Sequence, residues 1–512
     1  MNGYHATMMR FARGALTAIV CWGLQASLPT AAAQDRYAKP DPFDACVLSL
    51  QRAVKPPPGG GRTPALLSLI ELRDPELRPL YQTLLQRQDQ PVLQADAVLG
   101  LAMTDPKGSL DPIVLRQIKD KALRSEVIKT LIGRDLLKAT EINQILLWKD
   151  EILPQDRLFL VATLQRLEGA KGWQSSALAD MGDTKVAELL ALRALLLLEQ
   201  GETQPWDDFG KELMQMTPAQ RDTILSLVTP AVRAYRLNAA AGPLLRIATD
   251  REVNPNVRAA LIGSVLDLDP PAGLAALRDE VSRDRSRSNL VRYGLLLLVV
   301  SDKAEVADFD AVTLPEEPEL MRLADAGKAA KSGERFAESL SKLVDIGLRP
   351  AAEWAIAKAA ARGGAEGTTV LNHVLDLSAG ARDPRDGVLV LAVRAAQALI
   401  PLDPDGLKQR LLSAETPMPT RDAIMVALVD AGTPEAAAIA SSVRETLSRR
   451  FGSMALITMA KAGSFPEELL PQLAVVASGG GAVEDALQAQ AAWLYLKSIR
   501  RQKDALARVS PA

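Results

Sequence analysis

The sequence predicts an all-α fold built from stacked pairs of short helices. Alanine and leucine fill most apolar positions, and both are strong helix formers. Alternating runs of Val, Ile, Thr and aromatic residues, which are typical of strands, are nearly absent. Proline or glycine recurs about every 12 to 20 residues. Because proline is tolerated in the first turn of a helix, this spacing predicts helices of three to four turns joined by short connections.

The N-terminus has the three parts of a secretory signal. Arg10 and Arg13 precede an apolar run over residues 15–28, and small residues at 31–33 follow it. We expect cleavage after Ala33 and export across the inner membrane of a bacterium into the periplasm. Cys21 is preceded by the bulky Val20, which fits a lipoprotein signal poorly, so a soluble product is expected. Removal of residues 1–33 takes away two arginines and no acid, which moves the formal charge from −2 to about −4.

This charge balance gives the mature chain no global attraction for nucleic acid or for an anionic membrane. Its apolar runs, such as 194–198 and 294–300, are shorter than the roughly 20 residues that a spanning helix needs, so no transmembrane segment is expected after cleavage. One cysteine, Cys46, is left, and one thiol cannot form an internal disulfide. We interpret Cys46 as a small buried apolar residue. A bridge to another chain is the alternative.

Composition divides the chain into segments. Residues 34–62 form a Pro/Gly-rich N-terminal segment and linker, in which 43–54 is a short helix. A first helical array is expected over 63–303, beginning at the cap Thr63-Pro64. Residues 304–334 are acidic and rich in Pro and Gly, and they are either a boundary or one irregular repeat. A second array is expected over 335–512.

The best repeat unit has a recognisable second helix. It opens at Asn254-Pro255, continues with Val257-Arg258 and then has small apolar residues, while 90–101, 121–132 and 419–428 follow this pattern in part. The pattern resembles HEAT or armadillo repeats. This resemblance implies a right-handed α-α superhelix, a HEAT-like solenoid of helix pairs, whose long surface binds proteins and which carries no catalytic residues. Tetratricopeptide repeats are disfavoured because they need recurrent aromatic positions and this chain is only 4% aromatic.

Few residues are available for chemistry. His373 is the one histidine after the signal, and no Gly-x-Ser-x-Gly elbow occurs, so nucleophilic triads have little support. The glycine clusters lack the Gly-Lys-Ser/Thr ending of a phosphate-binding loop. We therefore predict no cofactor, no metal and no catalytic residue. Glu316, Glu317 and Glu319 could act as acid and base only inside an enclosing cleft, and we expect them to be solvated.

Two groups of residues are candidates for partner binding. Arg283, Arg285 and Arg287 cluster at a helix junction, where guanidinium groups suit carboxylate or phosphate partners. Asp279, Glu280 and Asp284 lie among them, so a self-neutralised surface loop is the alternative. Trp173 and Trp206 could anchor a partner if exposed, whereas burial between repeats would make them part of the core.

The sequence therefore predicts an exported, non-catalytic scaffold that binds a protein or a cell-envelope component through an extended helical surface. Two alternatives stay open. The first is an enzyme of cell-wall metabolism, similar to a lytic transglycosylase with a superhelical body and with an unrecognised carboxylate site. The second is a structural envelope protein that assembles end to end.

Overall fold

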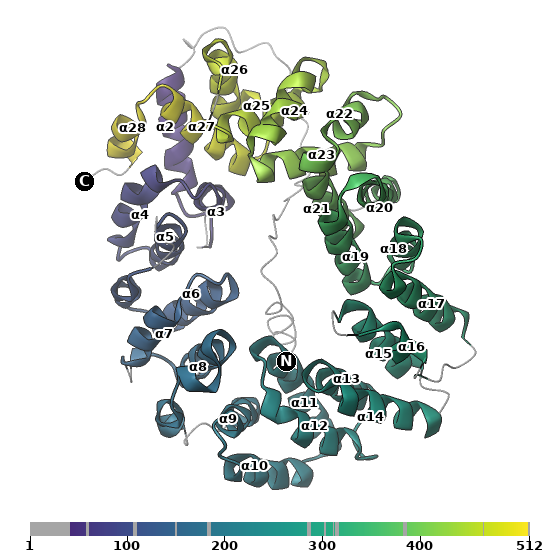
Figure 1. Ribbon diagram of the computed structural model, residues 1–512. Helices are drawn as coiled ribbons and strands as arrows, with labels where there is room; N and C mark the ends of the chain where they lie inside the picture. Colours follow the sequence, from purple (N-terminus) through teal and green to yellow (C-terminus); the bar gives the residue numbers. More distant parts are fainter. Residues whose placement is uncertain are drawn as a thin grey trace. The chain divides into compact units, whose positions relative to one another are not determined.

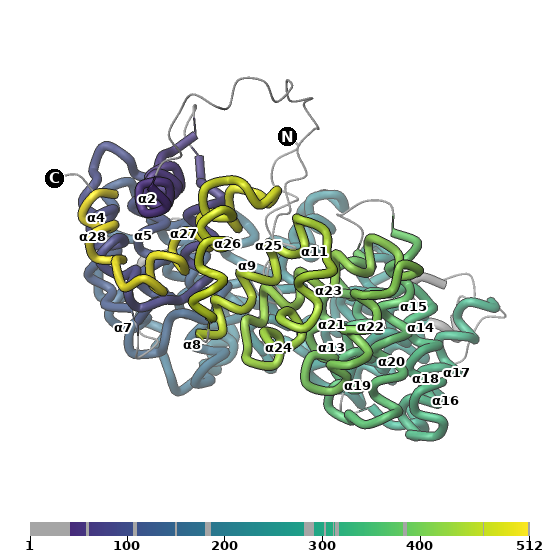
Figure 2. Tube along the Cα trace, turned by 90° about the horizontal axis from the view of Figure 1, so that it is seen from above, coloured from purple at the N-terminus to yellow at the C-terminus, as the bar shows by residue number. Residues whose placement is uncertain are grey.

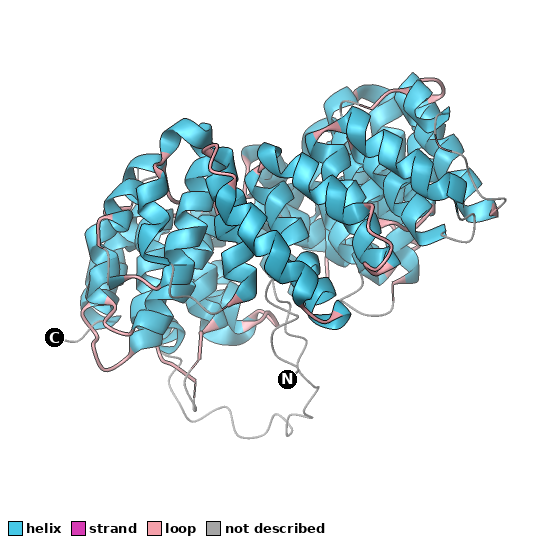
Figure 3. Ribbon diagram, turned by 90° about the horizontal axis from the view of Figure 1, so that it is seen from below, coloured by secondary structure: helices cyan, strands magenta, loops and turns pink. Residues whose placement is uncertain are grey.

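Helices make up the regular structure of the chain in the computed structural model. In the part of the chain that the structure describes, every regular element is an α-helix or a short 3₁₀ or π turn, which confirms the all-α prediction (Figure 3). None of the described helices is long and apolar enough to cross a bilayer. The predicted signal segment, residues 1–33, lies outside the described residues. These are residues 41–57, 61–105, 110–148, 151–181, 186–283, 288–301, 304–310, 312, 317–381, 387–463 and 465–509.

The chain divides into two compact units. Unit 2 contains the stretch up to Gly108 and the stretch from Ile356 onward, and unit 1 contains the residues between them, apart from a short exchange at 109–118. The chain therefore begins unit 2, builds unit 1 and then returns to complete unit 2. Helix α19 (Arg349–Arg362) spans the division.

The helices of unit 1 are α6 (Lys121–Gly133), α7 (Ala139–Leu146), α8 (Pro154–Glu168), α9 (Ala187–Glu199), α10 (Gln204–Gln215), α11 (Pro218–Tyr235), α12 (Ala241–Ala248), α13 (Pro255–Leu268), α14 (Pro270–Arg283), α15 (Ser288–Val300), α16 (Val306–Asp310), α17 (Pro318–Ser332) and α18 (Phe336–Asp345). The helices of unit 2 are α2 (Pro42–Ala53), α3 (Pro64–Glu71), α4 (Arg78–Leu85), α5 (Pro91–Met103), α20 (Gly364–Leu377), α21 (Gly387–Leu402), α22 (Pro404–Leu412), α23 (Met418–Ala431), α24 (Pro434–Val443), α25 (Arg449–Lys461), α26 (Leu470–Val475), α27 (Asp485–Ser498) and α28 (Gln502–Val509).

In unit 1, a series of helices stacks side by side, each in contact with the next: α6, α8, α9, α11, α13, α15 and α17 (Figure 1). Helices α10, α12, α14, α16 and α18 each pack against a member of this series. This alternation is the helix-pair repeat that the sequence predicts. The helices approach closely, because a Cβ placed on Gly263 of α13 would lie 2.1 Å from the ring of Tyr293 of α15. Any larger residue at 263 would force the side chains of Tyr293 and Leu297 to move.

Unit 2 has a corresponding stack, and it joins the two ends of the chain. Helices α21, α23, α25 and α27 follow one another, and α27 then packs against α3, which packs against α5. Figures 1 and 2 show the purple N-terminal helices beside the yellow C-terminal ones. First and last repeats are therefore neighbours in one continuous stack.

Polar contacts hold α3 and α27 together. Ser68 Oγ donates to the carbonyl of Ala486 at 2.7 Å, and Gln490 Nε2 donates to the carbonyl of Ser68 at 2.9 Å. The indole of the fully buried Trp493 donates to Asp74 Oδ2 at 2.9 Å, and Lys497 Nζ donates to the same oxygen at 2.8 Å. Burial alone would raise the pKa of Asp74, but these hydrogen bonds outweigh it and lower that pKa below its ordinary value.

We call the contact of α2 and α3 with α27 and α28 the joint. Helix α2 is part of it. The sequence suggests a short helix tethered outside the array, whereas the structure packs α2 against α27 and α28. Phe43 is buried, and the Arg501 guanidinium lies 3.8 Å from the centre of its ring. Ser49 Oγ donates to the carbonyl of Ala477 at 2.7 Å. The apolar face of α2 thus completes the core where the two ends of the chain meet.

A polar residue four positions after the N-cap recurs in the stacked helices. In several of these helices its side chain reaches back to a carbonyl before the helix, as Arg421 does with Thr416 at 2.9 Å and Gln94 does with Leu85 at 2.8 Å. There the side chain satisfies a backbone group of the preceding segment and helps to fix the turn before the helix. The residues at this position include Gln94, Arg124, Arg157, Arg221, Arg258, Arg421 and Gln488.

Several helix predictions are confirmed. Thr63-Pro64 precedes α3, and prolines begin α5, α11, α13 and α24. The apolar run 194–198 lies in helix α9, and its Leu195 and Leu196 are completely buried. Pro230 is an exception to the expected rule, because it lies inside α11. Residues 304–334 contain α16 and α17, and α17 continues the stack from α15.

Candidate functional site

The candidate site is a groove on α17 and α18 in unit 1, which we call the α17–α18 groove. Its volume is about 740 Å³, and Arg292 of α15 also lines it. Pro318 in the first turn of α17 and the left-handed Gly333 at its C-terminus set the limits of that helix. The tight turn that follows brings α18 back alongside α17, because Gly333 and Arg335 both have positive φ.

The floor of the groove is apolar. Leu323 and Ala326 of α17 are buried, and Ala329 lies one helical turn further along the same face. Ile346 and Leu348, which follow α18, complete the floor. Small alanines at spacing i, i+3 leave room for another backbone to approach.

Charged residues line both rims, and their sign changes at each turn along α17 and along α18. Glu334, in the connection between the two helices, also lines the groove. On α17 the order is Glu319, Arg322, Asp325. On the other rim the order is Arg335, Glu338, Lys342, Asp345. Spacings of three or four residues place each set on one side of its helix.

Exposed ion pairs occupy part of these rims. Lys342 Nζ lies 2.7 Å from Glu338 Oε1, with the two side chains 63% and 47% exposed, and this hydrogen bond lowers the pKa of Glu338. Arg292 pairs with Glu319. Arg322 Nε donates to the carbonyl of Pro318 at 3.4 Å, and neither it nor Asp325 forms an ion pair with another described residue. Since exposed pairs contribute little stability, the rim side chains can change partners at low cost.

The predicted arginine cluster lies mostly outside the described residues. Arg285 and Arg287 are not described, and Arg283 ends α14 without a described side chain. Their partner-binding role stays a prediction. Glu280, one of the acids expected near this loop, is buried and pairs with Arg258 of α13. The alternative of a self-neutralised loop also stays a prediction.

The two predicted tryptophans are separated and buried. Trp173 is 5% exposed, and its indole donates to Gln165 Oε1 at 2.9 Å. Trp206 is 6% exposed and packs against Phe209 with ring centres 5.9 Å apart. Both indoles therefore take the core position that the sequence left open as the alternative. A role as partner anchors would require them to leave this packing.

The other residues singled out from the sequence are not brought together. His373 is half-buried on α20, and Cys46 is a buried free thiol on α2. Glu316 lies outside the described residues, whereas Glu319 is exposed on the groove. Among the described residues, no group of three or more His, Cys, Asp or Glu side chains is arranged to hold a metal ion.

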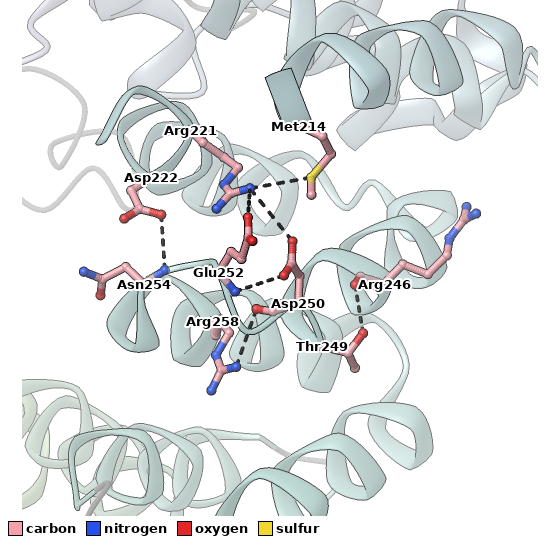
Figure 4. A network of polar contacts seen from close by, with 9 residues as sticks. All are labelled: Met214, Arg221, Asp222, Arg246, Thr249, Asp250, Glu252, Asn254 and Arg258. Atoms are coloured by element: carbon pink, nitrogen blue, oxygen red, sulfur yellow. Dashed lines mark hydrogen bonds and ion pairs between the residues drawn. The ribbon is translucent and has the colours of Figure 1, made fainter. Parts of the chain in front are cut away.

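Buried arginines elsewhere in unit 1 contact the connection between two helices. Figure 4 shows Arg221, which is 2% exposed, with Nη1 3.8 Å from Met214 Sδ, 3.9 Å from Asp250 Oδ2 and 4.0 Å from Glu252 Oε2. Arg258 donates to the carbonyl of Asp250 at 3.5 Å. The two arginines hold the connection between α12 and α13, and their burial leaves no access for a ligand.

A second titratable cluster lies in unit 2. Lys461 Nζ donates to the carbonyl of Val429 at 2.6 Å. Burial lowers the pKa of Lys461 and raises that of Asp430, although the opposite charges of the two groups counteract both shifts. Glu71 at the end of α3 adds a second negative charge that acts on both groups. The cluster thus links the N-terminal and C-terminal stretches electrostatically.

The chain matches no protein-family model, and comparisons with curated proteins and with solved structures find no match either.

The groove is not predicted by the sequence pattern. Apart from Arg292 of α15, its lining residues lie within 304–334, which the sequence leaves open as a boundary or an irregular repeat, and within 335–348. The alternation of sign along α17 and α18 is visible in the sequence, but the apolar floor emerges only when the two helices are placed side by side.

Proposed function

We propose that this protein is an exported, non-catalytic scaffold that binds a protein partner on the surface of its stacked helix pairs. The α17–α18 groove is the observation that carries the proposal. It combines an apolar floor with exposed charged rims, and this composition is typical of surfaces that bind protein segments. Export rests on residues 1–33.

The joint between α3 and α27 supports a binder over end-to-end assembly. An array that polymerises needs an uncovered helix face at each end. In unit 2 the described helices nearest the two ends of the sequence cover one another instead, because α27 packs against α2 and α3. The lateral surface of the helix pairs is then the part left for partners.

The test is site-specific photo-crosslinking in living cells of the native host. A photoreactive amino acid at Arg322 should give discrete crosslinked products with a partner protein, identified by mass spectrometry. The same amino acid at Glu212, an exposed residue of α10 in unit 1, is the matched control and should give none. Identical patterns at both positions, or no product at Arg322, would contradict the proposal.

The cell-wall enzyme is the second candidate, and the cluster of Asp430, Lys461 and Glu71 is the observation that favours it. Opposite pKa shifts in neighbouring groups are common at acid–base sites. If the scaffold proposal is right, Asp430→Asn and His373→Ala leave the cellular function intact. Loss of function in Asp430→Asn, with crosslinking at Arg322 and the fold both retained, would place the enzyme first.

A further inference from the structure

We propose that the α17–α18 groove is the docking site for an amphipathic α-helix of a partner protein, with an apolar stripe flanked by charges that change sign at every turn. This inference rests on the proposed function and names the kind of segment that the scaffold holds.

The dimensions of the groove suit one helix face. From Glu319 to Ala329 the lining of α17 spans about three turns, or roughly 15 Å at the rise of an α-helix. Leu323, Ala326 and Ala329 form a stripe along this length. A third helix laid between α17 and α18 would place its apolar side chains over the stripe, in the manner of a helix in a hydrophobic groove. The volume of about 740 Å³ accommodates the side chains of one such face.

The charges on the rims determine which charges the docked helix must carry on either side of its apolar face. A segment carrying only negative charge would meet Asp325 and Glu338, and one carrying only positive charge would meet Arg322 and Lys342. Only a helix whose own charges alternate can be attracted along the whole groove. The arrangement resembles the flanking positions of a coiled coil, where opposite charges decide partner and orientation.

The protein already has side chains available for these contacts. Arg322 and Asp325 form no ion pair with another described residue. Lys342 and Glu338 pair with each other while largely exposed, so they can re-pair with an incoming helix at little cost. The described rims therefore offer contacts of both signs without breaking a buried interaction.

The test uses two synthetic helical peptides of about 14 residues and identical composition, with the full-length mature chain. Both have leucines along one face. In the first, Glu faces Arg322 and Lys342 and Lys faces Asp325 and Glu338; in the second, Glu and Lys are exchanged. We expect the first to bind with a Kd on the order of 10–100 μM at low salt, and the second at least about tenfold more weakly. Fluorescence anisotropy measures both.

Charge reversal in the protein provides the reciprocal experiment. The double variant Arg322→Glu, Lys342→Glu changes exposed residues and should keep the thermal unfolding curve of the parent. All four of these rim positions are then negative, so each peptide meets two attractive and two repulsive positions, and the difference between the two affinities should disappear. Lys211→Glu on α10 is the matched control, because Lys211 is exposed in the same unit and far from the lining set, and it should change neither affinity.

Several outcomes would overturn the inference. For the parent chain these are equal affinity for the two peptides, no binding of either at about 1 mM, or stronger binding of an all-Glu or all-Lys helix. If crosslinking at Arg322 captures a partner but the peptides fail, the inference is wrong and the scaffold proposal stands. If the peptides discriminate but no partner is captured in cells, the groove has the proposed selectivity and the scaffold proposal fails.

Discussion

Asp96 on α5 is a completely buried carboxylate whose ionisation the fold opposes. Arg62 Nε lies 3.1 Å from its Oδ1, and no described residue donates a hydrogen bond to Oδ2. Burial raises the pKa of Asp96 to about 6, although the charge of Arg62 acts in the opposite direction. The native state therefore binds this proton more tightly than the unfolded chain does.

The sign of the pH effect follows from this shift. The contribution of Asp96 to stability is most favourable below pH of about 4, the ordinary pKa of aspartate, and it falls as the pH rises to about 6. Asp96→Asn cannot ionise, so we expect the variant to gain about 2–3 kcal/mol over the parent at pH 7 and almost nothing at pH 4. Urea unfolding at both pH values measures the difference. The exposed Asp89→Asn is the control, and an equal gain at pH 4 and pH 7 would contradict the assignment.

Cys46 lies inside the joint between α2 and α27, and burial raises the pKa of its thiol to about 12. Both burial and protonation make the thiol unreactive. We expect a maleimide reagent at pH 8 to leave the native protein unlabelled over hours and to label it fully in denaturant. A cysteine introduced at the exposed Ser478 should react within minutes in the native state. Rapid native labelling of Cys46, or a bridged dimer, would show that α2 detaches.

At the scale of the element, α9 shows how an almost entirely apolar helix is stabilised. Leu196 is fully buried in the stack, while Val186 before the helix is half-exposed. Truncation of a buried leucine removes apolar contacts and leaves a cavity, so Leu196→Ala should lower the free energy of unfolding by about 2–5 kcal/mol. Val186→Ala should change it by less than about 1 kcal/mol. Denaturant unfolding monitored for unit 1 tests both, and a small effect at Leu196 would place α9 on the surface.

Local patterns predicted most helices, because each start is encoded by a few neighbouring residues. Thr63-Pro64 and Asn254-Pro255 are examples in which the cap and the first-turn proline lie side by side in the sequence. The polar residue four positions after the cap could also have been found there, since Arg258 and Arg421 stand at the same offset. The pairing of Arg258 with Glu280 could not, because many carboxylates in the sequence are equally plausible partners.

Neither the groove nor the joint could be predicted from the sequence, and the reason is the same for both. Each depends on which helix faces lie next to one another, and apolar periodicity identifies a face without naming its partner. Trp493 illustrates this, because its partner Asp74 lies 419 positions away. In contrast, the stacking of neighbouring helix pairs followed from chain order alone.

At the scale of the whole molecule, the joint predicts that a destabilising substitution near one end of the sequence also destabilises helices near the other end. Trp493→Ala removes a large buried side chain and the hydrogen bond to Asp74, a loss of about 3–5 kcal/mol. We expect faster hydrogen exchange in α3 and α27, with α13 of unit 1 unchanged. Trp206→Ala is the matched control and should loosen α10 while leaving α3 protected. Unchanged exchange in α3 after Trp493→Ala would contradict the joint.

The order in which the chain is made gives this joint a further meaning. Helices α2 and α3 are synthesised first, but the helix that covers them, α27, is synthesised more than 400 residues later. Until then the faces of α2 and α3 that pack against α27 lack this native partner and are open to chaperones and proteases. A chain cut short before α27 keeps those faces uncovered. Exposure of the apolar faces of α2 and α3 therefore distinguishes a truncated chain from a full-length one.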